Sequence, residues 1–204
     1  KIVRSPKSFN SQIGVPLSVW EIKSEHTLGI FEAGISQAGE MDNLEKIIKP
    51  SIGLFTNIGE THNEGFLNMR HKINEKLNLF KNASTLIYCR DYHELHDCIL
   101  QFSTQLKNNI DKDLQLISWS RKGEADLLIS ATQKENAHTI INAVFKEREI
   151  SIQIPFTDDA YIEDSIHCWL TMLHLKISDE LIAQRMQKLA HIAMRLELIK
   201  GINN

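Results

Sequence analysis

Two side chains in the first third of the sequence are suited to metal binding or proton transfer. Glu32 comes directly after the apolar run 28–31, and His62 lies in the polar loop that follows a second apolar run, 52–55. A carboxylate and an imidazole can each bind a cation or move a proton. The structural alternatives are a Glu32 that caps a loop or pairs with a surface lysine, and a His62 that is simply hydrogen-bonded within its loop.

The segments around these residues predict the elements that position them. The runs 28–31 and 52–55 are typical of buried strands. Between them, an apolar stripe predicts a helix that ends before Pro50; its members are Met41, Leu44, Ile47 and Ile48. A strand, helix and strand with apolar strands predict parallel strands buried on both faces. Ligands bind beyond the carboxyl ends of such strands, where Glu32 and His62 are expected.

A third residue, Lys76, lies on the next predicted helix, from about Asn68 to Lys81. The apolar stripe of this helix consists of Met69, Ile73, Leu77 and Phe80. Helical geometry places Lys76 on the flank of that stripe, from which its side chain can reach inward. Lys72, one turn earlier, is the competing candidate.

The rest of the chain predicts further strands and helices. A strand at 85–89 and a helix at 92–106 come first. Between 114 and 156, four short β-rich segments separated by turns predict a small, mostly antiparallel sheet beside the parallel one. A helix at 158–176 begins with acidic residues, which suit a helix N-terminus, and Ser178 caps a last helix to about 189.

Composition narrows the class of protein. The 204 residues are 42% hydrophobic and 24% charged, which is ordinary for a globular domain. The net charge of −3 and the absence of a basic block argue against nucleic acid as a partner. No apolar run approaches the roughly 20 residues of a membrane helix. Three cysteines without metal-binding spacing indicate reduced thiols and a cytoplasmic location. The first residue is not methionine, and both ends are expected to be cuts in a longer protein.

The segment from Gly34 to Gly39 has the glycine spacing of a phosphate-binding loop. However, Glu40 and Met41 stand where that loop needs Lys and then Ser or Thr, and a carboxylate there would repel phosphate. No other segment of the 204 residues has the motif. The sequence therefore contains no phosphate loop.

Three segments carry a resemblance to a known family. FEAGISQAGEM and TNIGETHNEGF resemble the central domain of the Mur ligases, and most closely the type that adds D-alanyl-D-alanine to a UDP-N-acetylmuramoyl-tripeptide. RSPKSFNSQIGVPLSVWEI is similar to the form of that ligase fused to an alanine racemase. The resemblance implies an α/β central domain over 1–194 and the start of a C-terminal domain over 195–204. The strand with the phosphate loop would lie upstream and be missing here.

The resemblance also implies a metal site. Glu32 and His62 would bind Mg²⁺ together with Lys76, which matches the family's spacing for a carbamylated lysine. A carbamate forms only from a neutral amine, and burial lowers a lysine pKa. The structural alternative is a plain Lys76 in an ion pair with Glu75 or Glu32.

Further residues inherit substrate and nucleotide roles from the resemblance. Asn10, Ser11 and Gln12 match a loop that contacts the nucleotide-sugar substrate; the alternative is a solvated turn that caps a helix. Asp164 stands where the family has an asparagine near the adenine ring, and because a carboxylate cannot donate a hydrogen bond, that contact is in question. Arg195 resembles a hinge arginine near the nucleotide, although a surface salt bridge would also explain it.

The implied activity is ATP-dependent amide formation in peptidoglycan synthesis, through an acyl phosphate. The cofactors would be ATP and Mg²⁺, and the substrates UDP-N-acetylmuramoyl-tripeptide and D-alanyl-D-alanine, with a fused racemase domain as a further expectation. Two alternatives remain: a related ligase such as a folylpolyglutamate synthase, and a non-catalytic interaction domain that has lost its phosphate loop. The segment SFNSQIGVP favours the first reading over the related ligase.

Overall fold

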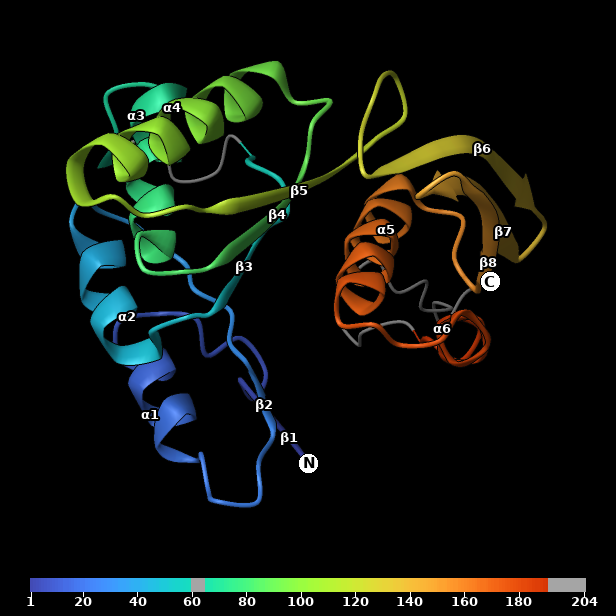
Figure 1. The fold of residues 1–204 in the computed structure, drawn as a ribbon. Helices are drawn as coiled ribbons and strands as arrows, with labels where there is room; N and C mark the ends of the chain where they lie inside the picture. The colour runs from blue at the N-terminus through green and yellow to red at the C-terminus, as the bar shows by residue number, and fades with distance from the viewer. Residues whose placement is uncertain (60–64, 191–204) are drawn as a thin grey trace, which may run out of the picture. The chain divides into compact units, whose positions relative to one another are not determined.

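The computed structural model describes residues 1–59 and 65–190. Strands and helices alternate over the first part of the chain, and successive strands and then two helices follow (Figure 1). The chain divides into two compact units, Lys1–Ser118 and Trp119–Asn204. The boundary falls inside the strand β5, Gln115–Ser120.

Parallel strands form the sheets of the first unit. β1 pairs with β2 in a separate two-stranded sheet, whereas β3 pairs in parallel with β4, and β5 is next in the order. These strands are β1 (Ile2–Arg4), β2 (Leu28–Ile30), β3 (Ile52–Phe55) and β4 (Thr85–Cys89). Every residue of β4 is buried, as expected for a strand covered on both faces.

Four helices belong to the same unit: α1 (Gly14–Trp20), α2 (Glu40–Ile48), α3 (Met69–Leu77) and α4 (His93–Ile110). The side chain of Asn68 caps α3 by accepting a 2.8 Å hydrogen bond from the amide of His71. A 3₁₀ turn, η2 (Asn78–Phe80), continues α3. The helix predicted from 68 to 81 is thus confirmed, with its last turn in tighter geometry.

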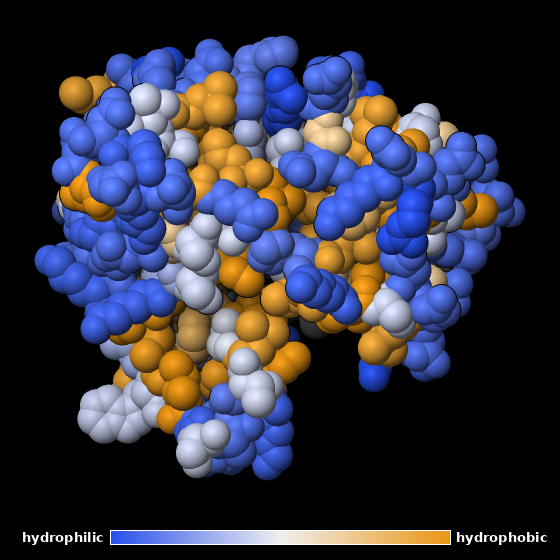
Figure 2. Space-filling view, in the orientation of Figure 1, coloured by the Kyte–Doolittle hydropathy of each residue, from blue (hydrophilic) through white to orange (hydrophobic). Residues whose placement is uncertain are grey.

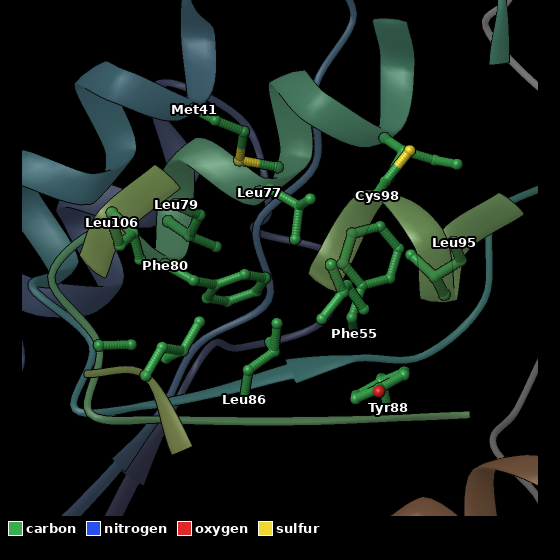
Figure 3. Packing of buried hydrophobic residues seen from close by; sticks show 14 of the residues in the cluster. Met41, Phe55, Leu77, Leu79, Phe80, Leu86, Tyr88, Leu95, Cys98 and Leu106 are labelled. Atoms are coloured by element: carbon green, nitrogen blue, oxygen red, sulfur yellow. The ribbon is translucent and has the colours of Figure 1, made fainter. Parts of the chain in front are cut away.

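The core of the first unit lies between these helices and strands. Side chains from α2, α3, η2, β3, β4 and α4 meet there, as the close view shows (Figure 3). Met41, Leu44, Ile73, Leu77 and Leu86 are at most 2% exposed. Ile73 and Leu77 of α3 are both buried in this core. The core therefore fixes the position of the α3 backbone, from which its polar side chains extend.

Two expectations for the first unit were wrong. β2 is not buried on both faces: within the described residues it pairs with β1 and not with β3, and Ile30 is 54% exposed. Ile47 is 37% exposed and is not part of the buried stripe of α2. Glu45 is buried in its place, because it accepts a hydrogen bond from Asn82 and lies 3.6 Å from the Lys81 ammonium.

Apolar side chains also reach the surface of the first unit. Figure 2 shows them in orange around the end that carries α1, β1 and β2. The exposed apolar side chains at this end include Ile2, Ile13 and Leu17, and the indole of Trp20 beside them is 86% exposed.

The second unit begins with the last residues of β5, which pair in parallel with β6 (Leu127–Glu135). β6, β7 (His138–Phe145) and β8 (Arg148–Ile154) then form an antiparallel series. α5 (Asp159–His174) and α6 (Asp179–Met186) follow. The inward stripe predicted for α5 is confirmed, since Ile162, Ile166, Trp169 and Leu173 are all buried.

Both helices of the second unit start at the residues expected from the sequence. Asp158 accepts hydrogen bonds from the amides of Ala160 and Tyr161, and Ser178 accepts one from the amide of Leu181. The predicted α/β fold with mostly parallel strands and flanking helices is therefore confirmed. The antiparallel strands do not form the separate small sheet that was expected, because β5 and β6 pair and join them to the six-stranded sheet. Among the helices of residues 1–59 and 65–190, none is long and apolar enough to span a membrane.

Candidate active site

A cavity of about 450 Å³ lies within the first unit. Its wall is formed by the loop after β1, the loop after β2 with the first residue of α2, the residues after β3, and α3. They contribute Asn10, Ser11 and Gln12; Glu32 to Ser36 with Glu40; Thr56, Asn57 and Gly59; and Lys72 with Lys76. The carboxyl ends of β2 and β3 thus open onto one cavity, which is where a parallel sheet commonly binds ligands.

Glu32 is held in this cavity by the loop after β1. The amide group of Asn10 donates a 2.8 Å hydrogen bond from Nδ2 to Oε1 of Glu32. The two loops also meet through their backbones, because the amide of Gly34 donates to the carbonyl of Asn10 over 2.8 Å. A Cβ at position 34 would lie 3.3 Å from the Asn10 side chain, so glycine permits this close approach.

Lys72 and Lys76 extend from successive turns of α3 into the same cavity. Lys72 is only 4% exposed, and its ammonium donates a 2.8 Å hydrogen bond to the carbonyl of Gly59. Burial lowers the pKa of Lys76, the neighbouring charge of Lys72 lowers it further, and Glu32 opposes the change. The lowered pKa makes the neutral amine of Lys76 easier to form than that of an exposed lysine.

Lys76 makes no ion pair within 4.0 Å in the part of the chain that the structure describes. The alternative interpretation of Lys76, a salt bridge to Glu75 or Glu32, is therefore not the arrangement observed. Glu75 instead accepts a 2.7 Å hydrogen bond from the amide of Gly39.

The glycine-containing loop 34–39 binds carboxylates of the chain itself. The amides of Ser36 and Gln37 donate to Oε2 of Glu40 over 2.6 and 3.0 Å. The hydrogen bond from the Ser36 amide is the main cause that lowers the pKa of Glu40, so this carboxylate is ionised at neutral pH. These amides are not free to hold phosphate, which confirms that the glycine spacing here is not that of a phosphate loop.

The two other residues predicted to contact substrate also line the cavity. The Ser11 hydroxyl accepts a hydrogen bond from the amide of Gly14, the first residue of α1, although the N-cap of this helix is Ile13 and has no side-chain cap. Gln12 donates from Nε2 to the carbonyl of Glu40 over 3.2 Å. Asn10 does not cap the helix, since its amide is bound to Glu32.

Three predicted site residues remain: His62, Arg195 and Asp164. His62 and Arg195 lie outside residues 1–59 and 65–190. Asp164 is exposed on α5 of the second unit. Within the described residues no group of three or more His, Cys, Asp or Glu side chains is arranged to hold a metal.

Sequence reasoning missed several residues that build the cavity. Thr56 and Asn57 line it directly after β3, a position that the strand pattern could have indicated. Glu40 and Glu75 hold the loop after β2 by accepting hydrogen bonds from its backbone amides. The amide bound by Glu75 belongs to Gly39, which lies 36 residues earlier in the chain. No spacing rule in the sequence reveals such a contact.

Solved structures with the same fold include MurF from Acinetobacter baumannii, with a TM-score of 0.82, 17% identity and coverage of 99% of this chain and 43% of that one. MurF ligase from Thermotoga maritima in complex with ADP has a TM-score of 0.74 at 15% identity, over 94% of this chain and 42% of that one. At these identities the likeness establishes the fold alone.

Sequence comparison gives the family. The UDP-N-acetylmuramoyl-tripeptide–D-alanyl-D-alanine ligase of Bacillus subtilis is 27% identical over 209 residues, which cover 98% of this chain but only 41% of that protein. The chain thus spans less than half the length of this relative. The family model described as the Mur ligase middle domain matches residues 1–163. The chain therefore belongs to the Mur ligase middle domain family.

Proposed function

We propose that this chain is the middle domain of an ATP-dependent amide ligase. The ligase would join D-alanyl-D-alanine to UDP-N-acetylmuramoyl-tripeptide in peptidoglycan synthesis. The observation that carries the proposal is the convergence of Asn10, Glu32 and Lys76 on one cavity in a Mur ligase middle domain. Because the chain spans under half the length of its B. subtilis relative, we propose the activity for the longer protein that carries this domain.

The donor groups of the cavity fit a magnesium ion. Mg²⁺ prefers hard oxygen ligands and usually keeps several waters and substrate phosphates. The Glu32 carboxylate supplies such oxygens, and a carbamate on Lys76 would supply more; His62 is the third proposed ligand. Bound there, the ion would neutralise the negative charge of a phosphoryl group during its transfer.

ATP is proposed to bind with help from residues that this chain lacks. The 204 residues contain no G-x-x-x-x-G-K-[ST] motif to hold the β- and γ-phosphates. Asp164 is proposed to accept a hydrogen bond from the amino group of adenine, which needs no donor on the protein side. Arg195 is proposed to lie near the nucleotide.

The proposed reaction has two steps. The terminal phosphoryl group of ATP is first transferred to the tripeptide carboxylate, which yields an acyl phosphate and ADP. The amine of D-alanyl-D-alanine then attacks the acyl carbon, and the tetrahedral intermediate expels phosphate to leave the amide. Asn10 keeps the Glu32 carboxylate oriented throughout, and Ser11 and Gln12 contribute polar groups toward the nucleotide-sugar substrate.

The test is a ligation assay with the full-length protein that carries this domain. ADP release should require the tripeptide substrate, D-alanyl-D-alanine and Mg²⁺ together. Activity with a reduced folate and glutamate instead would indicate the folylpolyglutamate synthase alternative. No turnover with either substrate set would indicate an interaction domain and refute the proposal.

A further inference from the structure

We propose that Glu75 is a positioning residue that holds the loop after β2 against α3 and so fixes the separation of Glu32 and Lys76. This inference rests on the proposed function for its catalytic consequence, but its structural part stands independently. Glu75 does not line the cavity, so its influence on the site must pass through the groups that it contacts.

The contact is short and directional. Oε2 of Glu75 accepts a 2.7 Å hydrogen bond from the amide of Gly39. Gly39 is the N-cap of α2, with a φ of 86°, a conformation that side-chain-bearing residues rarely adopt. A charge-assisted hydrogen bond at this position is stronger than a neutral one and anchors the end of the loop that begins at Glu32.

α3 makes a second connection to the wall of the cavity. The Lys72 ammonium donates a 2.8 Å hydrogen bond to the carbonyl of Gly59, beyond the carboxyl end of β3. One turn of α3 thus contacts the loop after β2 through Glu75 and the segment after β3 through Lys72. Lys76, one turn after Lys72 and next to Glu75 in the sequence, lines the cavity.

The consequence concerns the geometry of the reaction. α3 is fixed to the core through Ile73 and Leu77, which are fully buried. Glu32 and Gly39 are the two ends of one loop, whose internal amides bind Glu40. Without the Glu75 contact, this loop would keep its hydrogen bonds to α2 and to the Asn10 loop, and Ile35 would stay in the hydrophobic core that includes Ile73 and Leu77. The direct hydrogen bond between the loop and the helix that carries Lys76 would be lost. Displacements of about 1 Å at a reacting centre can cost as much as a hundredfold in rate.

Two variants separate the hydrogen bond from the charge. Glu75→Gln loses the charge but keeps an oxygen that can accept from Gly39. Glu75→Asp keeps the charge, but its side chain is one methylene shorter and cannot reach. In the full-length protein, Glu75→Asp should lower kcat about tenfold with little change in the KM for either substrate, whereas Glu75→Gln should stay within about threefold of wild type. Asn74→Ala, an exposed neighbour on α3, is the matched control and should leave kinetics unchanged.

Hydrogen–deuterium exchange of the full-length protein supplies a readout that does not depend on turnover. Peptides that cover residues 34–39 should exchange faster in Glu75→Asp, but not in Glu75→Gln or Asn74→Ala. Wild-type exchange in Glu75→Asp would overturn the inference, as would equal kinetic loss in the Asp and Gln variants. A wild-type protein that shows no ligation would refute the proposed function, while the exchange result would still decide whether Glu75 holds the loop.

Discussion

Asn10 and Glu32 lie 22 residues apart in the sequence, and the Nδ2 of Asn10 donates a 2.8 Å hydrogen bond to the Oε1 of Glu32. The bond joins the loop after β1 to the loop after β2. It limits the rotation of the exposed carboxylate that we propose as a metal ligand. Groups that orient the ligands of a metal commonly matter nearly as much as the ligands themselves.

The first prediction follows from this contact. In the full-length protein, Asn10→Ala should lower kcat/KM about tenfold, because a hydrogen bond to a charged group is lost. Asn10→Asp should be worse, since it places a second carboxylate against Glu32. Asn43→Ala, an exposed asparagine on α2, is the control. Steady-state ligation rates decide the matter, and equal rates for Asn10→Ala and wild type would disprove the role.

The second prediction concerns carbamylation. We expect Lys76→Ala to be inactive and to recover partly when a small carboxylate is added to fill the gap left by the carbamate. Lys72→Ala should also lose activity, because its contact with Gly59 disappears, but added carboxylate should not restore it. Ligation rates across a carboxylate titration test this. Rescue of Lys72→Ala and not of Lys76→Ala would show that the wrong lysine has been chosen.

The third prediction separates stability from function. The folded-state pKa of Lys76 lies below the ordinary value of 10.5, because of burial and the charge of Lys72. Between the folded and unfolded pKa values the unfolded chain binds more protons, so stability rises with pH across that interval. At pH values below both the folded and the unfolded pKa, the amine is charged in both states, and the folded protein bears the full free-energy cost of the buried charge. Lys76→Met should therefore raise Tm at neutral pH, and the gain should shrink as the pH approaches 10.5.

Thermal unfolding of the ligand-free protein at pH 7 and pH 10 measures this difference. Lys46→Met, an exposed lysine on α2, should leave Tm nearly unchanged at both values. A lower Tm for Lys76→Met at neutral pH would show that the amine stabilises the folded state, contrary to expectation.

Much of the fold could be predicted because local signals agree with it. The helix from Asn68, the acidic cap at Asp158 and the Ser178 cap begin where the sequence indicates. The exposure of β2 could not be predicted, because an apolar run gives no information about which strand it will pair with. The burial of Glu45 in place of Ile47 depends on contacts with Lys81 and Asn82, which lie far along the chain.

The candidate site could be predicted in part. Glu32 was predicted to follow a strand end, and Lys76 was predicted from helical periodicity to reach inward; both line the cavity. The pairs Asn10–Glu32 and Gly39–Glu75 could not be predicted, since each joins residues from different loops or helices. Such contacts are decided by the packing of α3 and the two loops, and no local pattern encodes them.

The fourth prediction concerns the 204 residues as a separate chain. They should fold, because the cores of both units are well buried, but should not bind Mg-ATP at micromolar concentrations. The amides of the only glycine-spaced loop are bound to Glu40 and Glu75, and the sequence has no other motif to hold the phosphates. Calorimetry with Mg-ATP measures this; a micromolar Kd would mean that the nucleotide site has been placed wrongly.

The most direct test of the proposed centre is the magnesium dependence of ligation by Glu32→Gln in the full-length protein. The change is nearly isosteric, so the fold and the contact with Asn10 should survive, while the anionic oxygen is lost. We predict that Glu32→Gln loses most activity at every magnesium concentration, with an unchanged Tm. Wild-type rates and a wild-type magnesium dependence in this variant would contradict the assignment of Glu32 and of the cavity around it.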